Sequence, residues 1–281
     1  MGRIIMSAFA DEYDESFEGQ LQGLLNLGIG NIEIRGVDGK NVSTLTRGEV
    51  GEVKSKLNYY GISVSSIGSP VGKVKLDSDL DAHLEMAKRV FDTANELGAP
   101  YVRMFSFYAP EGKKIVDFRD KVFVELARLA DAAREQGIVL CHENEALIYG
   151  DVPERCREIF DTFPNDIRCV FDMGNFALDG IDPLPAYELL KDRIAYFHIK
   201  DALGAGAIVP PGRGEAHIGE ILAKHAEYSH SDFYISLEPH LQLFSGLNSL
   251  AGRSFDNPYK YNDMKEAFVD ALTKLKELLP E

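Results

Sequence analysis

The sequence contains few cysteines, and their spacing is not that of a disulfide or metal-binding framework. Cys141, Cys156 and Cys169 are the only three, an odd number, and no two of them form a C-x-x-C pair. Cys141 and Cys169 fall within apolar runs that are typical of strands, where a free cysteine behaves as a small buried hydrophobic residue. This pattern disfavours a disulfide-stapled secreted protein and favours a reducing compartment.

Positive charge is also scarce. The 281 residues include 30 Lys and Arg against 45 Asp and Glu, which gives a formal net charge of −15. A surface this acidic repels the phosphates of nucleic acids and the anionic headgroups of cytoplasmic membranes, so we expect neither as a partner. A small molecule bound in a local pocket remains compatible with the charge.

Long hydrophobic runs are missing. No stretch of the chain approaches the ~18 consecutive apolar residues that a membrane-spanning helix needs. The apolar start, residues 1–7, is too short for the hydrophobic region of a signal peptide. We therefore expect a cytoplasmic protein.

What the sequence does contain is a regular alternation of short apolar runs with longer helical patterns. Most of the short runs are apolar throughout, as expected for parallel strands that are covered on both faces. Their spacing is that of a repeated strand–helix unit. The eight candidate strands are residues 4–9, 31–35, 62–67, 101–105, 138–142, 169–172, 195–198 and 233–238.

The segments between these runs have helical patterns, and several of them end at a glycine. A glycine just past the last helical turn adopts the left-handed conformation that ends a helix before the next strand. The predicted helices with defined ends are residues 17–27, 50–60, 82–97, 122–136 and the closing 264–279.

This alternation predicts an α/β fold, a (β/α)8 barrel, in which residues 1–281 form a single domain. No linker or change of composition interrupts the pattern. The alternative is an open, doubly wound sheet. That fold would need a crossover to a second face, and no G-x-G-x-x-G dinucleotide-binding motif follows the first run.

Four successive candidate strands end in a side chain that can bind a metal ion, namely Glu143, Asp172, His198 and Glu238. The C-terminal ends of barrel strands converge on one mouth, where active sites form, so we expect these side chains to meet. Three carboxylates and one imidazole favour one divalent ion, Mn²⁺ first and Mg²⁺, Co²⁺ or Zn²⁺ next, over a closed structural zinc site. The alternative for each residue is an ordinary polar group at a strand end.

The strings around these residues resemble a known family. HENEALIYGD, FDMGNF, YFHIKDA and SLEPH are similar to motifs of the sugar phosphate isomerase/epimerase family of xylose isomerase-like barrels, and the resemblance covers nearly the whole chain. It implies that Glu143, Asp172, His198 and Glu238 bind the ion. It also implies that Glu143 and Glu238 act as catalytic carboxylates, one on each face of the substrate.

The chain departs from this family at Asn175 and Glu145, where its members often have histidine. A second metal ion is therefore disfavoured, and with it a multi-zinc DNA-repair endonuclease, which the acidic charge also disfavours.

The resemblance implies a metal-dependent isomerase or epimerase that acts on a small sugar or polyol, with or without a phosphate group. A carboxylate would remove a proton next to a carbonyl and give an enediolate. Return of the proton to the opposite face is epimerisation, and return to the neighbouring carbon is isomerisation. Loss of a hydroxyl instead gives a dehydratase of the inosose dehydratase type, and a non-catalytic sugar-binding barrel is a further alternative. By analogy with such barrels, we expect a homo-oligomer, a dimer or tetramer.

Four more residues are candidates for substrate contact: Lys200 just after the histidine ligand, Arg213 on the following loop, Lys73 after the third candidate strand, and Glu33 near the end of the second. Lys200 could hold a substrate oxygen or a developing negative charge. The structural alternatives are an ion pair for Lys200, a solvated loop for Arg213, and a buried strand-end ion pair for Glu33.

Two histidines lie beside candidate ligands in the sequence. Alternation along a strand turns His142 away from the side that Glu143 faces, so we expect it to pack behind the site, and His240 follows Glu238 closely. The remaining histidines, His225 among them, lie in helical or loop segments and are expected to be solvated. Residues 245–261 form a long segment after the last candidate strand, which we expect to act as a lid or a subunit contact.

Overall fold

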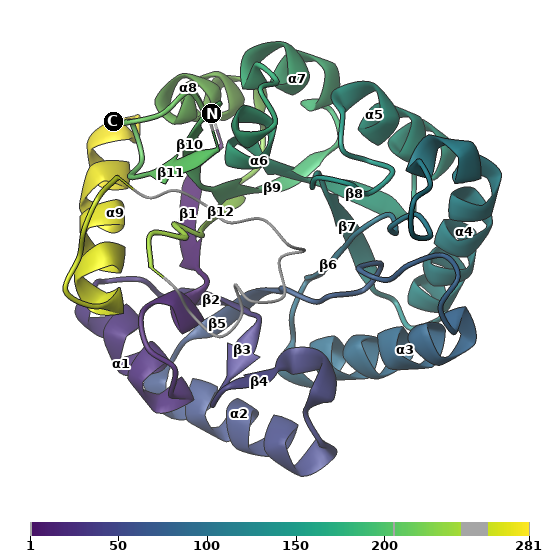
Figure 1. Ribbon diagram of the computed structural model, residues 1–281. Coiled ribbons are helices and arrows are strands. Elements are labelled where there is room, and N and C mark those ends of the chain that lie inside the picture. The colour runs from purple at the N-terminus through teal and green to yellow at the C-terminus, as the bar shows by residue number, and fades with distance from the viewer. Residues whose placement is uncertain (1, 205, 243–257, 281) are drawn as a thin grey trace.

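The computed structural model describes residues 2–204, 206–242 and 258–280. Its main sheet has eight strands, all parallel, which curve around a common axis with helices on the outside (Figure 1). The predicted (β/α)8 barrel is confirmed. The predicted lid or subunit contact at residues 245–261 falls largely on residues 243–257, which lie outside the described ranges.

The barrel strands lie where the apolar runs predicted them, with ends that differ by at most two residues. Their order around the sheet is β1-β12-β9-β8-β7-β6-β5-β2. The strands are β1 (Ile4–Ala8), β2 (Asn31–Ile34), β5 (Ser63–Ile67), β6 (Tyr101–Met104), β7 (Val139–Glu143), β8 (Ile167–Asp172), β9 (Ile194–Ile199) and β12 (Phe233–Leu237).

Two short antiparallel ribbons were not predicted. β3 (Gly36–Val37) pairs with β4 (Lys40–Asn41), and β10 (Asp201–Leu203) pairs with β11 (Ala207–Val209). Strands this short show no hydrophobic periodicity, so they leave no signal in the sequence. Each ribbon follows a barrel strand directly, β2 or β9, and so extends the mouth of the barrel.

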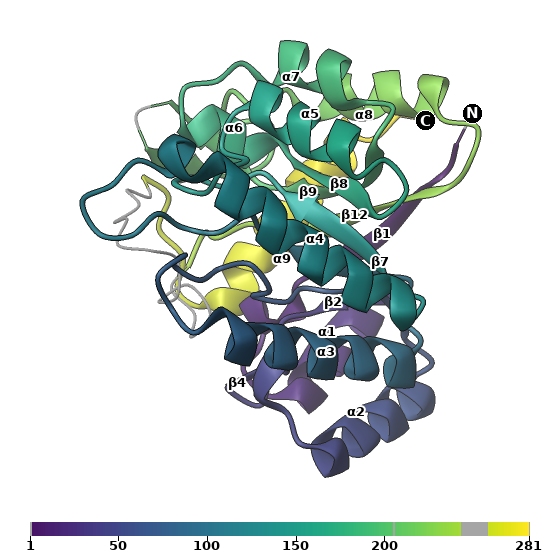
Figure 2. The same ribbon diagram turned by 90° about the vertical axis from the view of Figure 1, so that its right-hand side faces the viewer.

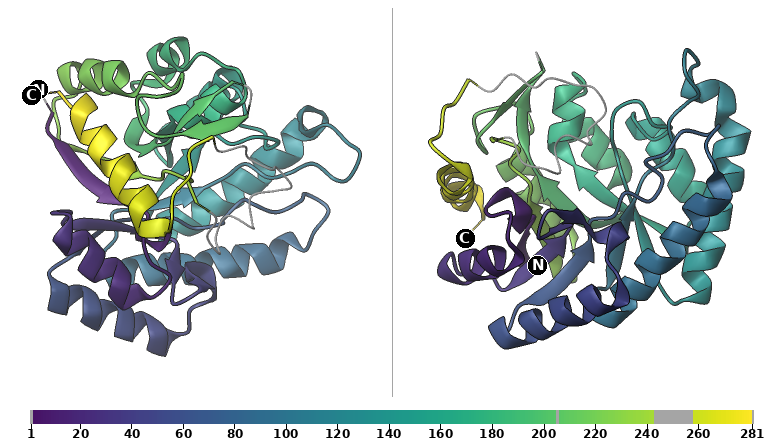
Figure 3. Two further views of the ribbon diagram at one scale, coloured as in Figure 1. Left: turned by 60° about the vertical axis from the view of Figure 1, so that its left-hand side comes forward. Right: turned by 60° about the horizontal axis from the view of Figure 1, so that its bottom comes forward.

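Helices surround the barrel, as Figures 1 and 2 show, and the last helix, α9 (Met264–Leu278), packs on its outside between α1 (Phe17–Asn26) and α8 (Ile218–Tyr228) (Figures 1 and 3). The helices α2 and α3 end as predicted, at Gly61 and Gly98 in the left-handed conformation. The helices are α1 (Phe17–Asn26), α2 (Arg47–Tyr60), α3 (Leu80–Leu97), α4 (Arg119–Glu135), α5 (Pro153–Thr162), α6 (Met173–Leu178), α7 (Pro183–Leu190), α8 (Ile218–Tyr228) and α9 (Met264–Leu278), with the short 3-10 helices η1 (Ala10–Glu12), η2 (Val42–Thr44) and η3 (Ile115–Phe118).

The barrel closes between β1 and β2. These strands lie next to each other, but within the described residues they share no backbone ladder. The side-chain amide of Asn31 bridges them and donates a hydrogen bond to the carbonyl oxygen of Met6 at 3.1 Å. Inside the barrel, the hydroxyls of Ser7 on β1 and Ser65 on β5 lie 2.6 Å apart. Side chains therefore complete the ring of strands that forms the mouth.

All three cysteines are free and buried. Cys141 lies in β7 and Cys169 in β8, while Cys156 lies in α5, which covers the same side of the barrel (Figure 1). Burial raises the pKa of each of these thiols above its ordinary value. The cysteines are thus small core residues and not reactive thiols.

His225 is buried, so its expected solvation is wrong. It lies on the inner side of α8 with its ring 4.8 Å from that of Phe197 and 4.7 Å from that of Phe233. Its Nδ1 atom lies 3.4 Å from the hydroxyl of Tyr187. The helical spacing gives the reason, because His225 follows Ile221 by four residues and shares its inward face.

The burial of His225 should make the protein sensitive to mild acid. Burial lowers the pKa of His225 from its ordinary value of 6.5 to about 4. The folded protein therefore binds this proton less tightly than the unfolded chain. Neutral, buried His225 therefore contributes fully to the free energy of unfolding above pH ~6.5. This contribution, at most about 3 kcal/mol, is lost as the pH falls toward ~4.

We expect His225→Phe to reduce this loss. The free energy of unfolding, measured with urea at several pH values, should decline less between neutral and acid pH in the variant than in the native protein. His230→Phe is the matched control, since His230 is exposed. Equal declines in the native protein and in His225→Phe would contradict the prediction.

Candidate metal centre

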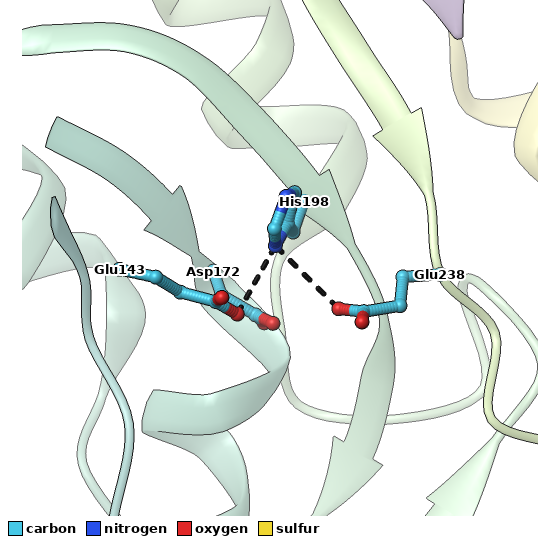
Figure 4. Close-up of side chains that lie close together, drawn as sticks. All are labelled: Glu143, Asp172, His198 and Glu238. Carbon is cyan, nitrogen blue, oxygen red and sulfur yellow. Dashed lines mark hydrogen bonds and ion pairs between the residues drawn. The ribbon is translucent and has the colours of Figure 1, made fainter. Parts of the chain in front are cut away.

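The four predicted ligands meet at the C-terminal end of the barrel strands. Glu143 and Asp172 are the last residues of β7 and β8, His198 lies near the end of β9, and Glu238 directly follows β12. One donor atom from each side chain lies within 4.8 Å of the other three, and all four residues are buried. Figure 4 shows the carboxylates and the imidazole directed toward one another. This group could hold a metal ion.

The register of the parallel strands explains why these residues meet. Asp172 on β8 lies opposite His198 on β9, and His198 lies opposite Ser236 on β12. Because side chains alternate along a strand, Glu238 shares the inward face of Ser236. The end of β7 places Glu143 opposite Val170, two residues before Asp172 on the same face. Register and alternation together bring the four side chains to one point inside the barrel.

Two buried carboxylate oxygens of the cluster lack a hydrogen bond. Asp172 uses Oδ1 to accept the backbone N–H of Asn175 at 2.9 Å, while its Oδ2 accepts none and lies 2.8 Å from the Nζ atom of Lys200. Oε2 of Glu143 also accepts none and lies 3.1 Å from Nη1 of Arg103. Each oxygen thus faces a positive charge but accepts no hydrogen bond, and buried oxygens in this state need an explanation. Since carboxylate oxygens are ligands for hard divalent cations, these residues fit a metal ion.

His198 presents one ring nitrogen to the cluster and the other to a carboxylate deeper in the barrel. Nδ1 lies 3.0 Å from Glu143 Oε1 and 3.5 Å from Glu238 Oε2, and Nε2 lies 3.2 Å from Glu33 Oε2. Burial alone would lower the pKa of His198, but Glu143 and Glu33 outweigh it and raise this pKa to about 10. A metal ligand must have a free nitrogen lone pair, so binding of an ion at Nδ1 would release a proton.

Each of the two glutamates is also held by an arginine. Nη1 of Arg103 lies 3.1 Å from Glu143 Oε2, and Nη1 of Arg35 lies 2.7 Å from Glu238 Oε1. The guanidinium carbons of Arg35 and Arg103 lie 4.4 Å and 5.1 Å from the centre of the Phe9 ring, which follows β1. The arginines are thus fixed by stacking as well as by charge, and they fix the carboxylates in turn.

A second group at the mouth, Glu12 with Glu238 and His240, is also close enough to share an ion. Arg35 lies among them, with Nη2 3.0 Å from Glu12 Oε1 and Nη1 2.7 Å from Glu238 Oε1. The guanidinium already supplies the positive charge that this group needs. We therefore interpret it as a buried ion-pair network and not as a second metal site.

Two asparagines that the sequence did not single out as contacts hold the ligands in place. The side chain of Asn144 donates to the carbonyl oxygen of Asp172 at 2.8 Å and accepts its backbone N–H at 3.0 Å. Asn175 donates to Glu143 Oε1 at 3.3 Å and to the carbonyl oxygen of Asn144 at 2.9 Å. Their only signal in the sequence is that both stand within three residues of a candidate ligand.

The sequence matches the family of xylose isomerase-like TIM barrels over residues 22–277. The chain belongs to this family. The resemblance that the four sequence strings indicated is thereby confirmed. No curated protein matches the chain in sequence.

Solved structures of similar fold include enzymes of more than one class. The D-allulose 3-epimerase from Methylomonas sp. has a TM-score of 0.74 at 17% identity and covers 99% of each chain. The probable 3-DHS dehydratase AsbF from Bacillus anthracis has a TM-score of 0.71 at 14% identity, covering 99% of this chain and 98% of its own. A xylose isomerase-like TIM barrel protein from Mycobacterium smegmatis, in complex with magnesium, has a TM-score of 0.67 at 16% identity, covering 100% and 98%. At such identities the likeness concerns the fold alone.

In this xylose isomerase-like barrel, a small pocket opens above the cluster. Its free volume of about 30 Å³ is that of roughly one water molecule. Lys73 and Glu145 form its most exposed ion pair, with Nζ and Oε2 3.2 Å apart. A substrate can therefore enter only when side chains such as these two move aside. The residues that line the pocket are Arg35, Asn41, Pro70, Lys73, Arg103, Glu143, Glu145, Lys200, Glu238 and His240.

Two of the four predicted substrate contacts line this pocket, and the other two do not. Lys73 and Lys200 line it. Arg213 is exposed on the loop after β11, and within the described part of the chain no contact joins it to the cluster. Glu33 is buried beneath His198, where its oxygens contact the Tyr196 hydroxyl at 2.9 Å and His198 Nε2 at 3.2 Å.

His142 packs behind the cluster, as expected from alternation along β7. It is fully buried, and its Nε2 lies 2.9 Å from the hydroxyl oxygen of Ser106, which also accepts the backbone N–H of Gly150 at 2.8 Å.

No helix within the described ranges is both long and apolar enough to cross a membrane.

Replacement of Lys200 by methionine should destabilise this barrel strongly when divalent ions have been removed with EDTA. The Lys200 ammonium lies 2.8 Å from Asp172 Oδ2 and 3.4 Å from Glu238 Oε2, and all three groups are buried. Burial alone would lower the pKa of Lys200, but these two carboxylates outweigh it and raise that pKa. Removal of one partner of a buried ion pair costs about 3–5 kcal/mol, because the other charge is left buried alone.

The free energy of unfolding of Lys200→Met, measured with urea in EDTA, tests this expectation. Added Mn²⁺ should then raise the Tm of the variant by more than that of the native protein, since the ion supplies the missing charge. Lys88→Met is the matched control, because Lys88 pairs with Glu85 on the surface and such a pair contributes at most ~1 kcal/mol. Equal stability of the two variants in EDTA would contradict the prediction.

Proposed function

We propose that this barrel is a divalent-metal-dependent isomerase or epimerase that acts on a small sugar or polyol. The proposal depends above all on the buried set of Glu143, Asp172, His198 and Glu238, in which two glutamates flank the other ligands. Membership of the xylose isomerase-like family and the fold shared with a D-allulose 3-epimerase support it.

We propose that the four side chains hold one ion, with Mn²⁺ preferred and Mg²⁺, Co²⁺ or Zn²⁺ as alternatives. Three carboxylates and one imidazole suit such ions, and a magnesium complex of a similar barrel is consistent with this choice. When bound, a divalent ion polarises a substrate carbonyl and makes the neighbouring C–H bond more acidic.

Glu143 and Glu238 are the proposed proton-transfer residues. Burial alone would raise the pKa of both, but the charges around them hold each pKa low, His198 and Arg103 near Glu143 and Lys200 near Glu238. Both carboxylates are therefore ionised near neutral pH and able to accept a proton.

The proposed reaction begins when one of these carboxylates takes the proton next to the carbonyl, and the electron pair of the C–H bond moves into the enediolate. Return of that proton by the same carboxyl group to the former carbonyl carbon is an isomerisation, in which the hydroxyl proton moves from the neighbouring oxygen to the former carbonyl oxygen. Epimerisation requires that the opposite carboxyl group be protonated and deliver its proton to the other face. Both routes conserve the atoms of the substrate.

Lys73 and Lys200 are the proposed substrate contacts, since both ammonium groups face the pocket. A substrate hydroxyl or carbonyl oxygen that displaces Glu145 from Lys73 would gain a charged donor. Arg213 and Glu33 are not required for this role, because neither lines the pocket: Arg213 is exposed, and Glu33 contacts His198.

A dehydratase is the second candidate, and the position of Lys200 favours it. Its ammonium lies 3.4 Å from Glu238 Oε2, so a base and a proton donor stand side by side. Glu238 would take the proton next to the carbonyl, the C–H electrons would form the C=C bond, and Lys200 would protonate the departing hydroxyl as water. The probable 3-DHS dehydratase among the similar folds is consistent with this alternative.

The test is a screen of the Mn²⁺-loaded protein against ketoses, aldoses and cyclic keto-polyols in D₂O, followed by NMR and mass spectrometry. Metal-dependent conversion without loss of water would support the isomerase or epimerase, and solvent deuterium on carbon would show that the carboxyl proton exchanges before it is returned. Loss of one water would identify the dehydratase. If the native protein binds no divalent ion after reconstitution, or if no compound is converted or exchanges a proton, the proposal is wrong.

A further inference from the structure

A chain of buried polar side chains runs from the metal cluster into the barrel. His198 Nε2 lies 3.2 Å from Glu33 Oε2, and Glu33 Oε1 accepts a hydrogen bond from the Tyr196 hydroxyl at 2.9 Å. The Tyr196 hydroxyl lies 2.9 Å from that of Ser66. None of these four residues is more than 1% exposed. Groups buried so deeply have few ways to meet water, so each contact must satisfy a specific donor or acceptor.

The strands aim Glu33 at His198 from across the barrel. Tyr196 and His198 are two residues apart on β9 and share its inward face, whereas β2, which carries Glu33, is not a neighbour of β9 in the sheet. The pairing of β2 with β5 shifts register between Ile32 and Glu33. The extra residue is Ser65 on β5, so alternation along β2 is unbroken and turns Glu33 to the face opposite that of Ile32 and Ile34.

We propose that Glu33 is a positioning residue for metal binding, which accepts the Nε2–H of His198 and so directs the lone pair of Nδ1 at the cluster. This inference about Glu33 depends on one part of the proposed function, namely that His198 binds a divalent ion. A neutral imidazole carries one N–H, and the nitrogen that faces an acceptor keeps it. A carboxylate acceptor also makes the opposite nitrogen more basic and hence a better ligand.

Tyr196 and Ser66 complete the arrangement by fixing Glu33. The Tyr196 hydroxyl donates a hydrogen bond to Glu33 Oε1, so Oε2 remains to accept one from His198. Ser66 can donate its own hydrogen either to Tyr196 or to the carbonyl oxygen of Tyr101, 3.3 Å away. The competing interpretation is that these four polar side chains only satisfy one another's hydrogen bonds and stabilise the fold. The two interpretations differ in what they predict for the metal affinity.

Three variants separate these interpretations. Glu33→Leu removes the acceptor, so its Kd for Mn²⁺ should rise about 100-fold. Glu33→Gln keeps an amide oxygen for His198 and can donate to Tyr196, but it loses the charge, so we expect a rise of about 10-fold. Tyr196→Phe leaves the contact between His198 and Glu33 in place and should change the Kd least. The Kd is measured by titrating EDTA-treated full-length protein with Mn²⁺ and following the free ion by electron paramagnetic resonance.

A second readout reports the imidazole directly. In Zn²⁺-loaded protein with ¹⁵N-labelled histidine, the nitrogen shifts of His198 should show the proton on Nε2 in the native protein and in Glu33→Gln. In Glu33→Leu, the shifts should change or broaden. Thermal melts identify any variant that fails to fold. If Glu33→Leu does not fold, the Kd values of Glu33→Gln and Tyr196→Phe decide between the two interpretations. A positioning role for Glu33 requires the larger rise in Glu33→Gln.

The outcomes separate this inference from the proposed function. If Glu33→Leu and Glu33→Gln bind Mn²⁺ as tightly as the native protein, while His198→Asn does not bind it, the inference is overturned and the metal site stands. A lower Tm without a change in Kd would likewise reduce Glu33 to a structural residue. If the native protein itself binds no ion, the proposed function fails together with the inference.

Discussion

Replacement of Asp172 by asparagine is expected to weaken Mn²⁺ binding by more than about 100-fold, the upper range for loss of a group that only supports a ligand. The start of α6 should be preserved, because asparagine is as good a helix N-cap as aspartate. Its amide oxygen can still accept the backbone N–H of Asn175, which Asp172 Oδ1 accepts at 2.9 Å. The substitution therefore removes the negative charge that faces the cluster and keeps the start of α6. Loss of the ion pair with Lys200 should lower the Tm, but Lys200 keeps Glu238 as a partner at 3.4 Å, so we expect the barrel to stay folded.

The measurement is a titration of EDTA-treated protein with Mn²⁺, with the free ion followed by electron paramagnetic resonance. Asp79→Asn is the matched control, because Asp79 caps α3 in the same way, by accepting the N–H of Ala82 at 2.9 Å, and lies outside the cluster. The control should bind one Mn²⁺ like the native protein. If Asp172→Asn also binds one Mn²⁺ with native affinity, Asp172 is a cap and not a ligand.

The second large effect is expected for the two glutamates. Glu143→Gln and Glu238→Gln should each lower kcat by about 10²–10⁴-fold, the usual contribution of a general acid or base, when assayed with the metal at saturating concentration. The two carboxylates reach the cluster from different sides, Glu143 from β7 and Glu238 from the end of β12. The pattern of deuterium exchange in D₂O should therefore differ between the two variants.

For an epimerase, each variant keeps the carboxylate of one face. Each should exchange deuterium into only one of the two epimers, while neither interconverts them. For an isomerase that uses one carboxylate, only one variant should lose exchange. Glu96→Gln, which alters an exposed partner of Lys54, is the control and should leave kcat unchanged. Full activity of both Glu143→Gln and Glu238→Gln would rule out the proposed chemistry.

The fold and the ligand set could be predicted from the sequence because both depend on local patterns. Continuous apolar runs identify strands covered on two faces, and the first polar residue after such a run lies at the mouth of the barrel. Asp172 and Glu143 were found in this way, each as the last residue of its strand. The barrel geometry then brings such residues together without further information from the sequence.

The contact between Glu33 and His198 could not be predicted, because it joins residues 165 positions apart on two strands that are not neighbours in the sheet. Alternation along β2 sets the face to which Glu33 points, but nothing in residues 31–34 indicates which side chain across the barrel it meets. The sequence also left open whether Arg213 contacts a substrate or lies on a solvated loop. Its exposed place depends on the short ribbon of β10 and β11 and on Asp201, which accepts backbone N–H groups from the following loop, including that of Gly214 at 3.0 Å.

The burial of His225 was missed for a different reason. A histidine on an amphipathic helix is usually assigned to the polar face. The spacing of His225 from Ile221, however, places it on the inner face of α8. Neutral imidazole can be buried when, as here, aromatic rings pack around it and a hydroxyl meets one nitrogen. Helical spacing was thus a better guide to the place of this residue than its polarity.

The three buried cysteines supply the chain with its own reporters of structural opening. A thiol in the folded barrel is shielded from a reagent such as Ellman's, so it can be labelled only when its part of the structure opens. When opening and closing are fast, the labelling rate measures the population of the open form. Cys141 and Cys169 would report separation of β7 and β8, and Cys156 the detachment of α5. Mass spectrometry of the labelled peptides would therefore rank the local stabilities of this wall of the barrel without an introduced probe.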